Sequence, residues 1–199
     1  MSTLGDIKSL YESGYLDDSK MIRLVRLGTL GNAVGITTAE FEEATGKKLE
    51  DVISLDDAKT LQHGTVNGKR ETSRNVITAT YDNDEFEVNR TSQINLTSVA
   101  SAAIIAIQSG AADTKFTYRS ATNTDHEFTA TQILELALVV VKKVQEIYDA
   151  SWTLKNKIDD ATTVDDVFSV LSNTDSILDE PAVTGDSSDS TDTTDTTAA

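Results

Sequence analysis

The strongest constraint on this fold is a helix start signal followed by a long, regularly spaced apolar stripe. Thr129 and Gln132 stand three residues apart, which is the spacing of a capping box. After them, apolar and small residues recur at alternating steps of four and three along residues 133–158. This spacing predicts one long helix with a continuous buried face.

The stripe has two interpretations, and the sequence leaves both open. Its members are Ile133, Ala137, Val140, Val144, Ile147, Ser151, Leu154 and Ile158. A globular domain buries such a face against its own elements, whereas a coiled coil buries it between chains. In the second interpretation, the candidate interface of a homo-oligomer consists of Val140, Val144, Ile147, Leu154 and Ile158.

The sequence before this helix predicts two β-hairpins separated by a second helix. Alternating residues surround turn-forming residues over 76–88 and again over 115–128. Between them, Thr91 or Ser92 begins a helix that ends at Gly110. We expect the apolar face of this helix to contain Ile94, Val99, Ala102, Ala103, Ile105 and Ala106.

The first part of the chain, residues 1–61, has the pattern of a small helical module. Short apolar segments follow cap residues such as Thr37 and stop at glycines. Gly28, Gly31 and Gly35, between two of these helices, predict a flexible loop.

Two further segments are poor in apolar residues. Residues 62–75 contain only Val66 among polar and glycine residues, which is typical of a linker or an extended arm. Residues 173–199 contain many acids, no Lys and no Arg. Their apolar surface is too small to offset the entropy of an ordered backbone, so we expect a disordered acidic tail.

Together these patterns predict an α+β protein, in which a helical module precedes two β-hairpins packed with a mid-chain helix and a long C-terminal helix. The predicted parts are the N-terminal helical module, residues 1–61; the linker or arm, residues 62–75; the α+β domain, residues 76–172; and the acidic tail, residues 173–199. Because the chain has no Cys, packing without disulfides must hold this fold.

The residues that could perform chemistry are few and scattered. The two His residues, His63 and His126, stand in unrelated contexts. Asp82-Asn83-Asp84 starts like a calcium-binding loop, but Phe86 stands at a ligand position and Glu87 where that loop needs Gly. We expect no enzyme activity, no cofactor, and no catalytic, cofactor-binding or metal-binding residues.

Charge and hydropathy limit the partners. The chain carries 17 Lys and Arg against 33 Asp and Glu, a formal net charge of −16. Since a negative surface repels phosphate groups, we expect no nucleic-acid partner. No segment reaches the ~20 uninterrupted apolar residues of a spanning helix, so we also expect no membrane partner.

Residues 11–46 contain a spaced series of Tyr, Gly and apolar residues. The series is Tyr11, Gly14-Tyr15-Leu16-Asp17, Met21, Val25, Gly28, Ile36-Thr37-Thr38-Ala39-Glu40-Phe41 and Ala44-Thr45-Gly46. It resembles the XkdX family, small proteins encoded among the tail genes of phages and defective prophages. Phe41 replaces the usual Tyr, and Thr29–Gly35 is an insertion relative to that family.

A second series of motifs covers residues 76–171. It consists of Tyr81-Asp82 with Phe86, Ser92-Gln93, Phe116-Thr117-Tyr118-Arg119, Asn123-Thr124-Asp125-His126-Glu127-Phe128-Thr129, Trp152-x-Leu154-Lys155-x-x-Ile158 and Ala161-Thr162-Thr163-Val164. This series is similar to an uncharacterised domain common in phage tail-fibre and tail-fibre-assembly proteins. Neither resemblance implies a catalytic residue.

Both resemblances imply a virus particle. We therefore expect a structural component of a tailed bacteriophage virion, in the tail, baseplate or tail-fibre attachment, that is made in the host cytoplasm. Its expected partners are other phage tail proteins and, in the particle, further copies of itself. The alternative is a tail-fibre assembly chaperone that is absent from the mature particle.

Overall fold

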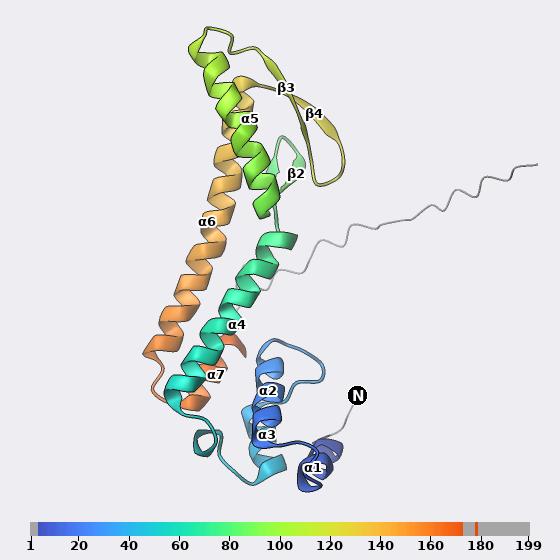
Figure 1. Ribbon diagram of the computed structural model, residues 1–199, viewed down its shortest axis with the longest axis vertical. Coiled ribbons are helices and arrows are strands. Elements are labelled where there is room, and N and C mark those ends of the chain that lie inside the picture. The colour runs from blue at the N-terminus through green and yellow to red at the C-terminus, as the bar shows by residue number, and fades with distance from the viewer. Residues whose placement is uncertain (1–3, 173–177, 179–199) are drawn as a thin grey trace, which may run out of the picture.

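The computed structural model describes residues 4–172 and Leu178. Over these residues the chain forms seven α-helices, one short 3₁₀ helix and two antiparallel two-stranded hairpins. Figure 1 shows an elongated molecule with a group of short helices at one end and the hairpins toward the other. The predicted α+β fold class is confirmed.

Helix α6 (Ala130–Asp160), with 31 residues, is the longest element. Its predicted capping box is present, since Thr129 Oγ1 accepts a hydrogen bond from Gln132 N and Gln132 Oε1 accepts one from Thr129 N. At 1.5 Å per residue, α6 is about 46 Å long and provides the surface on which other elements pack.

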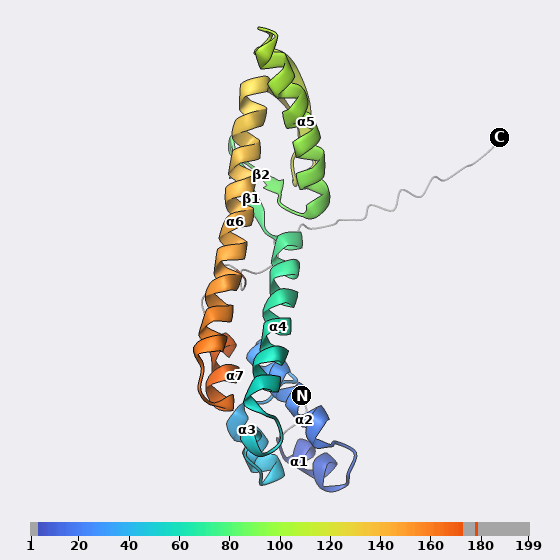
Figure 2. The same ribbon diagram turned by 60° about the vertical axis from the view of Figure 1, so that its left-hand side comes forward.

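Two helices lie end to end along α6, as Figures 1 and 2 show from two sides. Helix α4 (Leu55–Val76) covers the half of α6 near its C-terminus. Helix α5 (Arg90–Gln108) covers the other half and begins after Asn89, whose side chain accepts a hydrogen bond from Ser92 N. Asn89 therefore has the capping role predicted for Thr91 or Ser92.

The remaining helices close the end of the molecule near the C-terminus of α6. They are α1 (Leu4–Glu12), α2 (Asp18–Thr29), α3 (Thr38–Thr45), the 3₁₀ helix η1 (Leu49–Asp51) and α7 (Val164–Ser172). Helix α7 contacts α2 as well as α4 and α6. The buried residues of the N-terminal helices therefore belong to the same hydrophobic cluster as those of α6.

Both predicted hairpins are confirmed. Their strands are β1 (Thr78–Tyr81) with β2 (Asp84–Glu87), and β3 (Lys115–Arg119) with β4 (Asp125–Thr129). Asp82 and Asn83 form a two-residue turn with φ of 51° and 62°, the left-handed backbone that a type I′ turn requires. The hairpins are joined where Ala121 N donates a hydrogen bond to Glu85 O at 2.7 Å.

The predicted linker or arm over residues 62–75 is wrong, because these residues form most of α4. The helix buries polar side chains beside Val66, including Gln62, Thr65 and Ser73. One of them is bonded across the core, since Arg26 Nε donates to Thr65 Oγ1 at 2.8 Å. A pattern that counts only apolar residues misses a helix whose buried face is largely polar.

A close backbone contact explains two of the glycines assigned to a flexible loop. A Cβ on Gly35 would lie 1.9 Å from Gly28 N, and a Cβ on Gly28 would lie 2.2 Å from Ile36 O. Ile36 N also donates to Leu24 O at 3.1 Å. The interpretation as a flexible loop is therefore wrong for Gly28 and Gly35, which allow two backbone segments to pack.

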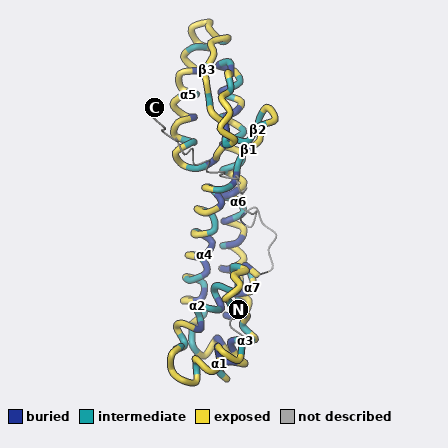
Figure 3. Tube along the Cα trace, turned by 90° about the vertical axis from the view of Figure 1, so that its right-hand side faces the viewer, coloured by how far each residue is buried: buried dark blue, intermediate teal, exposed yellow. Residues whose placement is uncertain are grey.

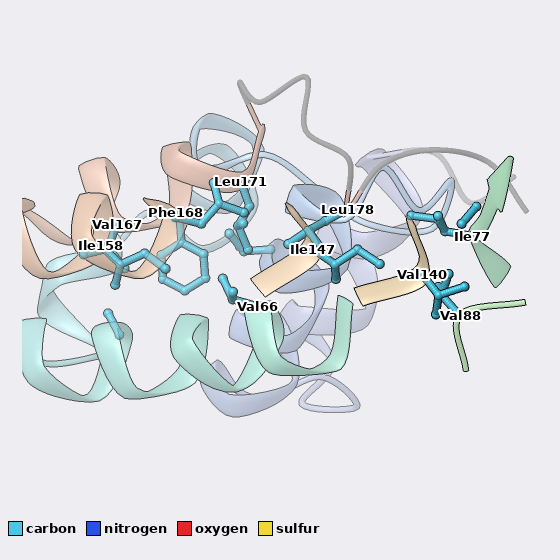
Figure 4. Packing of buried hydrophobic residues seen from close by; sticks show 14 of the residues in the cluster. Val66, Ile77, Val88, Val140, Ile147, Ile158, Val167, Phe168, Leu171 and Leu178 are labelled. Atoms are coloured by element: carbon cyan, nitrogen blue, oxygen red, sulfur yellow. The ribbon is translucent and has the colours of Figure 1, made fainter. Parts of the chain in front are cut away.

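The predicted acidic tail, residues 173–199, lies outside the described residues apart from Leu178. That side chain is buried, and Leu178 O accepts a hydrogen bond from Ser73 Oγ at 3.3 Å. Figure 4 shows Leu178 in the same cluster as Ile147 of α6. The packed body therefore includes this residue.

Candidate interaction surfaces

The predicted interface stripe of α6 lies inside the single chain. Val140, Ile147, Leu154 and Ile158 are at most 3% exposed, and Val144 is partly buried against the same cluster. Figure 4 shows Ile147 and Ile158 facing residues of α4 and α7. The interpretation of these five residues as an interface between chains is therefore wrong, because α4, α5, α7 and the hairpins already cover them.

A second stripe runs along a neighbouring side of α6, where each member follows a member of the inner stripe by one residue and so lies about 100° around the helix from it. Its members, again at steps of four and three, are Leu134, Leu138, Val141, Gln145, Tyr148 and Trp152, and we call them the α6 outer stripe. Leu138 is 54% exposed, Val141 61% and Trp152 50%. The sequence carried a signal for this face, since its heptad spacing is as regular as that of the inner stripe. The spacing does not indicate which of the two is covered.

Aromatic and basic side chains gather at one end of the α6 outer stripe. The ring centroids of Tyr148 and Trp152 are 5.9 Å apart. From α4, the guanidinium of Arg70 lies 4.9 Å and that of Arg74 5.7 Å from the Tyr148 centroid. Trp, Tyr and Arg are the residues most enriched where proteins bind proteins, so this cluster is a candidate binding site.

A third surface lies on α5. Ile94 and Ile105, 57% and 66% exposed, lie on one side of the helix with the exposed Ser98 and Ser101 between them. We call these four residues the α5 outer face. The predicted apolar face is therefore divided, because Ala103 is buried toward the body whereas both isoleucines point away from it. Figure 3 shows the exposed side of α5 in yellow.

The N-terminal helices form an open groove of about 660 Å³. Lys47 Nζ lies 2.8 Å from Asp18 Oδ2 at its wall, and Tyr11 OH donates to Asp18 Oδ1 at 2.7 Å. The hydrogen bonds from Lys47 and then Tyr11 lower the pKa of Asp18 below its ordinary value. Tyr11 and Thr45-Gly46, which carry part of the XkdX resemblance, line this groove.

The junction of the hairpins contains an interconnected polar cluster. His126 Nε2 lies 2.8 Å from Asp84 Oδ2, and Thr122 Oγ1 donates to Asp84 Oδ1 at 2.9 Å. The bond to His126, with those to Ser120 and the Glu85 amide, holds the pKa of Asp84 well below its ordinary value. Nearby, burial and a hydrogen bond to Glu135 raise the pKa of Tyr81 to about 12.

This cluster resembles a catalytic triad in composition but not in arrangement. In a triad the hydroxyl contacts the imidazole and the carboxylate holds the other ring nitrogen. Here the imidazole of His126 and the hydroxyl of Thr122 both bond to Asp84. The imidazole also stacks on Phe128 at 5.4 Å between ring centroids. The arrangement ties the two hairpins together.

The other residues considered for chemistry lie apart from this junction. His63 Nε2 is 2.9 Å from Asp159 Oδ1, at the boundary of α4 and α6. Among residues 4–172 and Leu178, no three His, Cys, Asp or Glu side chains are grouped so that they could hold a metal ion. None of the helices in the described part of the chain has the length and apolarity needed to cross a membrane.

The protein is elongated, has an α+β fold built on one long helix, and exposes apolar and aromatic side chains on α5 and α6. A family model described as a domain of unknown function, DUF4376, matches residues 49–172, and the chain belongs to this family. The match contains the predicted 76–172 domain and also η1 and α4. Comparisons with curated proteins and with solved structures gave no match.

Proposed function

We propose that this chain is a structural component of a tailed bacteriophage virion, in the tail, baseplate or tail-fibre attachment. It acts by binding other proteins and performs no reaction. The observation that carries the binding role is the α6 outer stripe, which leaves Leu138, Val141 and Trp152 half exposed or more on a rigid helix. Its placement in a phage rests on the motifs of residues 11–46 and 76–171.

The outer stripe supports protein binding because its exposed members Leu138, Val141 and Trp152 are not part of the hydrophobic cluster that holds the fold together. Side chains that only cover a helix in water are usually polar, whereas this stripe presents Leu, Val and Trp beside Tyr148 and Arg70. A rigid aromatic anchor loses little conformational entropy when it binds. We therefore expect Trp152 to contribute strongly to the binding of a neighbouring tail protein.

The place of the protein is tested with purified virions. Mass spectrometry of gradient-purified particles should show the chain at a fixed ratio to the major tail proteins. Its presence in the lysate together with its absence from particles would contradict the structural role. That result would favour the alternative, an assembly chaperone that leaves before the particle matures.

The binding surface is tested in the same particles. Trp152→Ala should reduce incorporation of the chain, whereas Thr153→Ala, at the exposed neighbouring position, should leave it unchanged. Circular dichroism of both purified variants controls for folding. Because Trp152 is the one Trp of the chain, its fluorescence also reports on this surface. Acrylamide should quench the fluorescence of Trp152 in the free chain and should quench it less when a partner is bound.

A further inference from the structure

We propose that the α5 outer face binds the same face of a second copy of this chain, with the two helices antiparallel. Ile94, Ser98, Ser101 and Ile105 are spaced by four, three and four residues. This order is the same when read in either direction. A two-fold axis between residues 99 and 100 therefore places Ile94 against Ile105 of the other copy, and Ser98 against its Ser101.

The charge distribution favours a second copy over a charged partner. The chain has a formal net charge of −16, so two copies repel each other through most of their surfaces. Between Arg90 and Asp113, however, there is no Asp, Glu, Lys or Arg. The α5 outer face itself is thus a place where two copies can meet without opposing like charges. The exposed Arg90, one turn before Ile94, lies at the edge of the face, and the two-fold axis places the two copies of Arg90 at opposite ends of the pair.

The hydroxyl groups on this side of α5 do not need a partner. Ser98 Oγ donates to Ile94 O at 3.1 Å, and Ser101 Oγ donates to Thr97 O at 2.8 Å. Their donors are therefore satisfied within the helix and can be buried at low cost. Because serine is small, the two helix axes can approach closely at the centre while the isoleucines pack at both ends.

The size of the face sets the expected strength. One side of a 19-residue helix is smaller than the ~800 Å² per partner of a standard interface. We therefore expect a monomer–dimer equilibrium rather than a permanent dimer. The inference is independent of the proposed place in a phage, since it concerns the purified chain alone.

Sedimentation velocity of the full chain, from about 1 to 500 µM, tests the proposal. Dimer should form with rising concentration. Ile94→Asp and Ile105→Asp should each raise the dissociation constant by at least about 100-fold, because the dimer would bury carboxylates without partners. Val141→Asp, the same change at an exposed site on the α6 outer stripe, should leave it unchanged. A strict monomer, or dimerisation that only Val141→Asp abolishes, would overturn the proposal.

Cross-linking through introduced Cys residues tests the antiparallel arrangement. Because the chain has no native Cys, every disulfide must involve an introduced residue. Ser98→Cys combined with Ser101→Cys should give disulfide-linked dimers on oxidation. Ile94→Cys alone should not, because its two copies lie about 16 Å apart along the helix axes. Disulfide-linked dimers of Ile94→Cys, or the absence of such dimers from the double variant, would overturn the antiparallel arrangement. This test does not depend on whether the Asp variants fold.

Discussion

Helices α4 and α5 cover successive halves of α6, yet their outer sides differ. The exposed residues of α4 are polar or glycine, including Asp57, Gly64, Gly68 and Glu71. Over the described part of the chain, no large apolar residue of α4 is exposed, whereas Ile94, Ile104, Ile105 and Ile107 of α5 are. Both helices pack on α6 with one side. Packing on α6 therefore does not determine which residues occupy the side that faces away from it.

The difference shows that folding constrains the residues on the inner side of each helix and does not constrain those on the outer side. The inner sides of both helices are buried and uncharged at their centres, with Val66 in α4 and Leu96 in α5. The outer side of α4 has the composition of a surface in contact with water. The outer side of α5 and the outer stripe of α6 do not have this composition, which supports the proposal that they contact other proteins.

The largest expected effect comes from placing a charge on the inner side of either helix, which tests whether both sides are equally necessary for folding. Val66→Asp and Leu96→Asp should each lower the free energy of unfolding by more than about 4 kcal/mol, because each buries an unpaired carboxylate. Urea unfolding followed by circular dichroism measures this effect. If one variant kept its stability, the corresponding helix would not pack on α6 as described.

Acid should next weaken the half that α5 covers, where the hairpin junction lies. The pKa of Asp84 is lowered in the folded chain, mainly by His126, so its contribution to stability is complete above about pH 4. That contribution is lost as the pH falls from there toward the folded pKa. Asp84→Asn should therefore flatten the acid side of the stability profile measured by urea unfolding.

A second substitution of a hairpin carboxylate serves as the control for Asp84→Asn. Asp125→Asn removes another hairpin carboxylate whose pKa is lowered, mainly by Arg119, but which makes no bond between the hairpins. We expect it to flatten the profile less than Asp84→Asn does. Equal effects would mean that the junction is no more important than an exposed ion pair.

Local signals in the sequence predicted the elements that depend on neighbouring residues. Thr129 with Gln132 marked the start of α6, and Asp82-Asn83-Asp84-Glu85 marked the first hairpin turn, because both depend on contacts within a few residues. The structure narrows that turn to Asp82 and Asn83, since Asp84 and Glu85 belong to β2. Helix α4 was missed because its buried face carries the polar residues Gln62 and Thr65, and the contact of Thr65 with Arg26 joins residues far apart in the chain. Polar residues on a buried face cannot be recognised by hydrophobic periodicity.

The surfaces were harder to predict for a related reason. Val140 and Val141 are neighbours in heptad stripes of α6, but one is 2% and the other 61% exposed. Which stripe is covered depends on where α4, α5 and the hairpins dock. On α5, Ile105 was likewise grouped with Ala103, and only the packing separates them. Periodicity predicted the helix, while tertiary contacts determined its exposed side.

A smaller effect should appear on the outer side of α4. A Cβ added at Gly64 would meet no atom within 4 Å, and the backbone there is helical. Gly64→Ala should therefore raise the free energy of unfolding by about 1 kcal/mol, since alanine has the higher helix propensity. Thermal unfolding measures this gain. A loss of stability would indicate a contact on α4 that the structure does not contain.

The smallest effect concerns the outer side of α5. Ile105 is 66% exposed, and isoleucine favours a helix less than alanine by a few tenths of a kcal/mol. In dilute chain, where the monomer dominates, Ile105→Ala should leave stability unchanged or raise it by about 0.4 kcal/mol. At high concentration the same variant should be less stable than the wild-type chain, because dimerisation stabilises only the folded state. A change of sign with concentration would show that Ile105 serves association, whereas a loss of stability in dilute chain would show that it serves the fold.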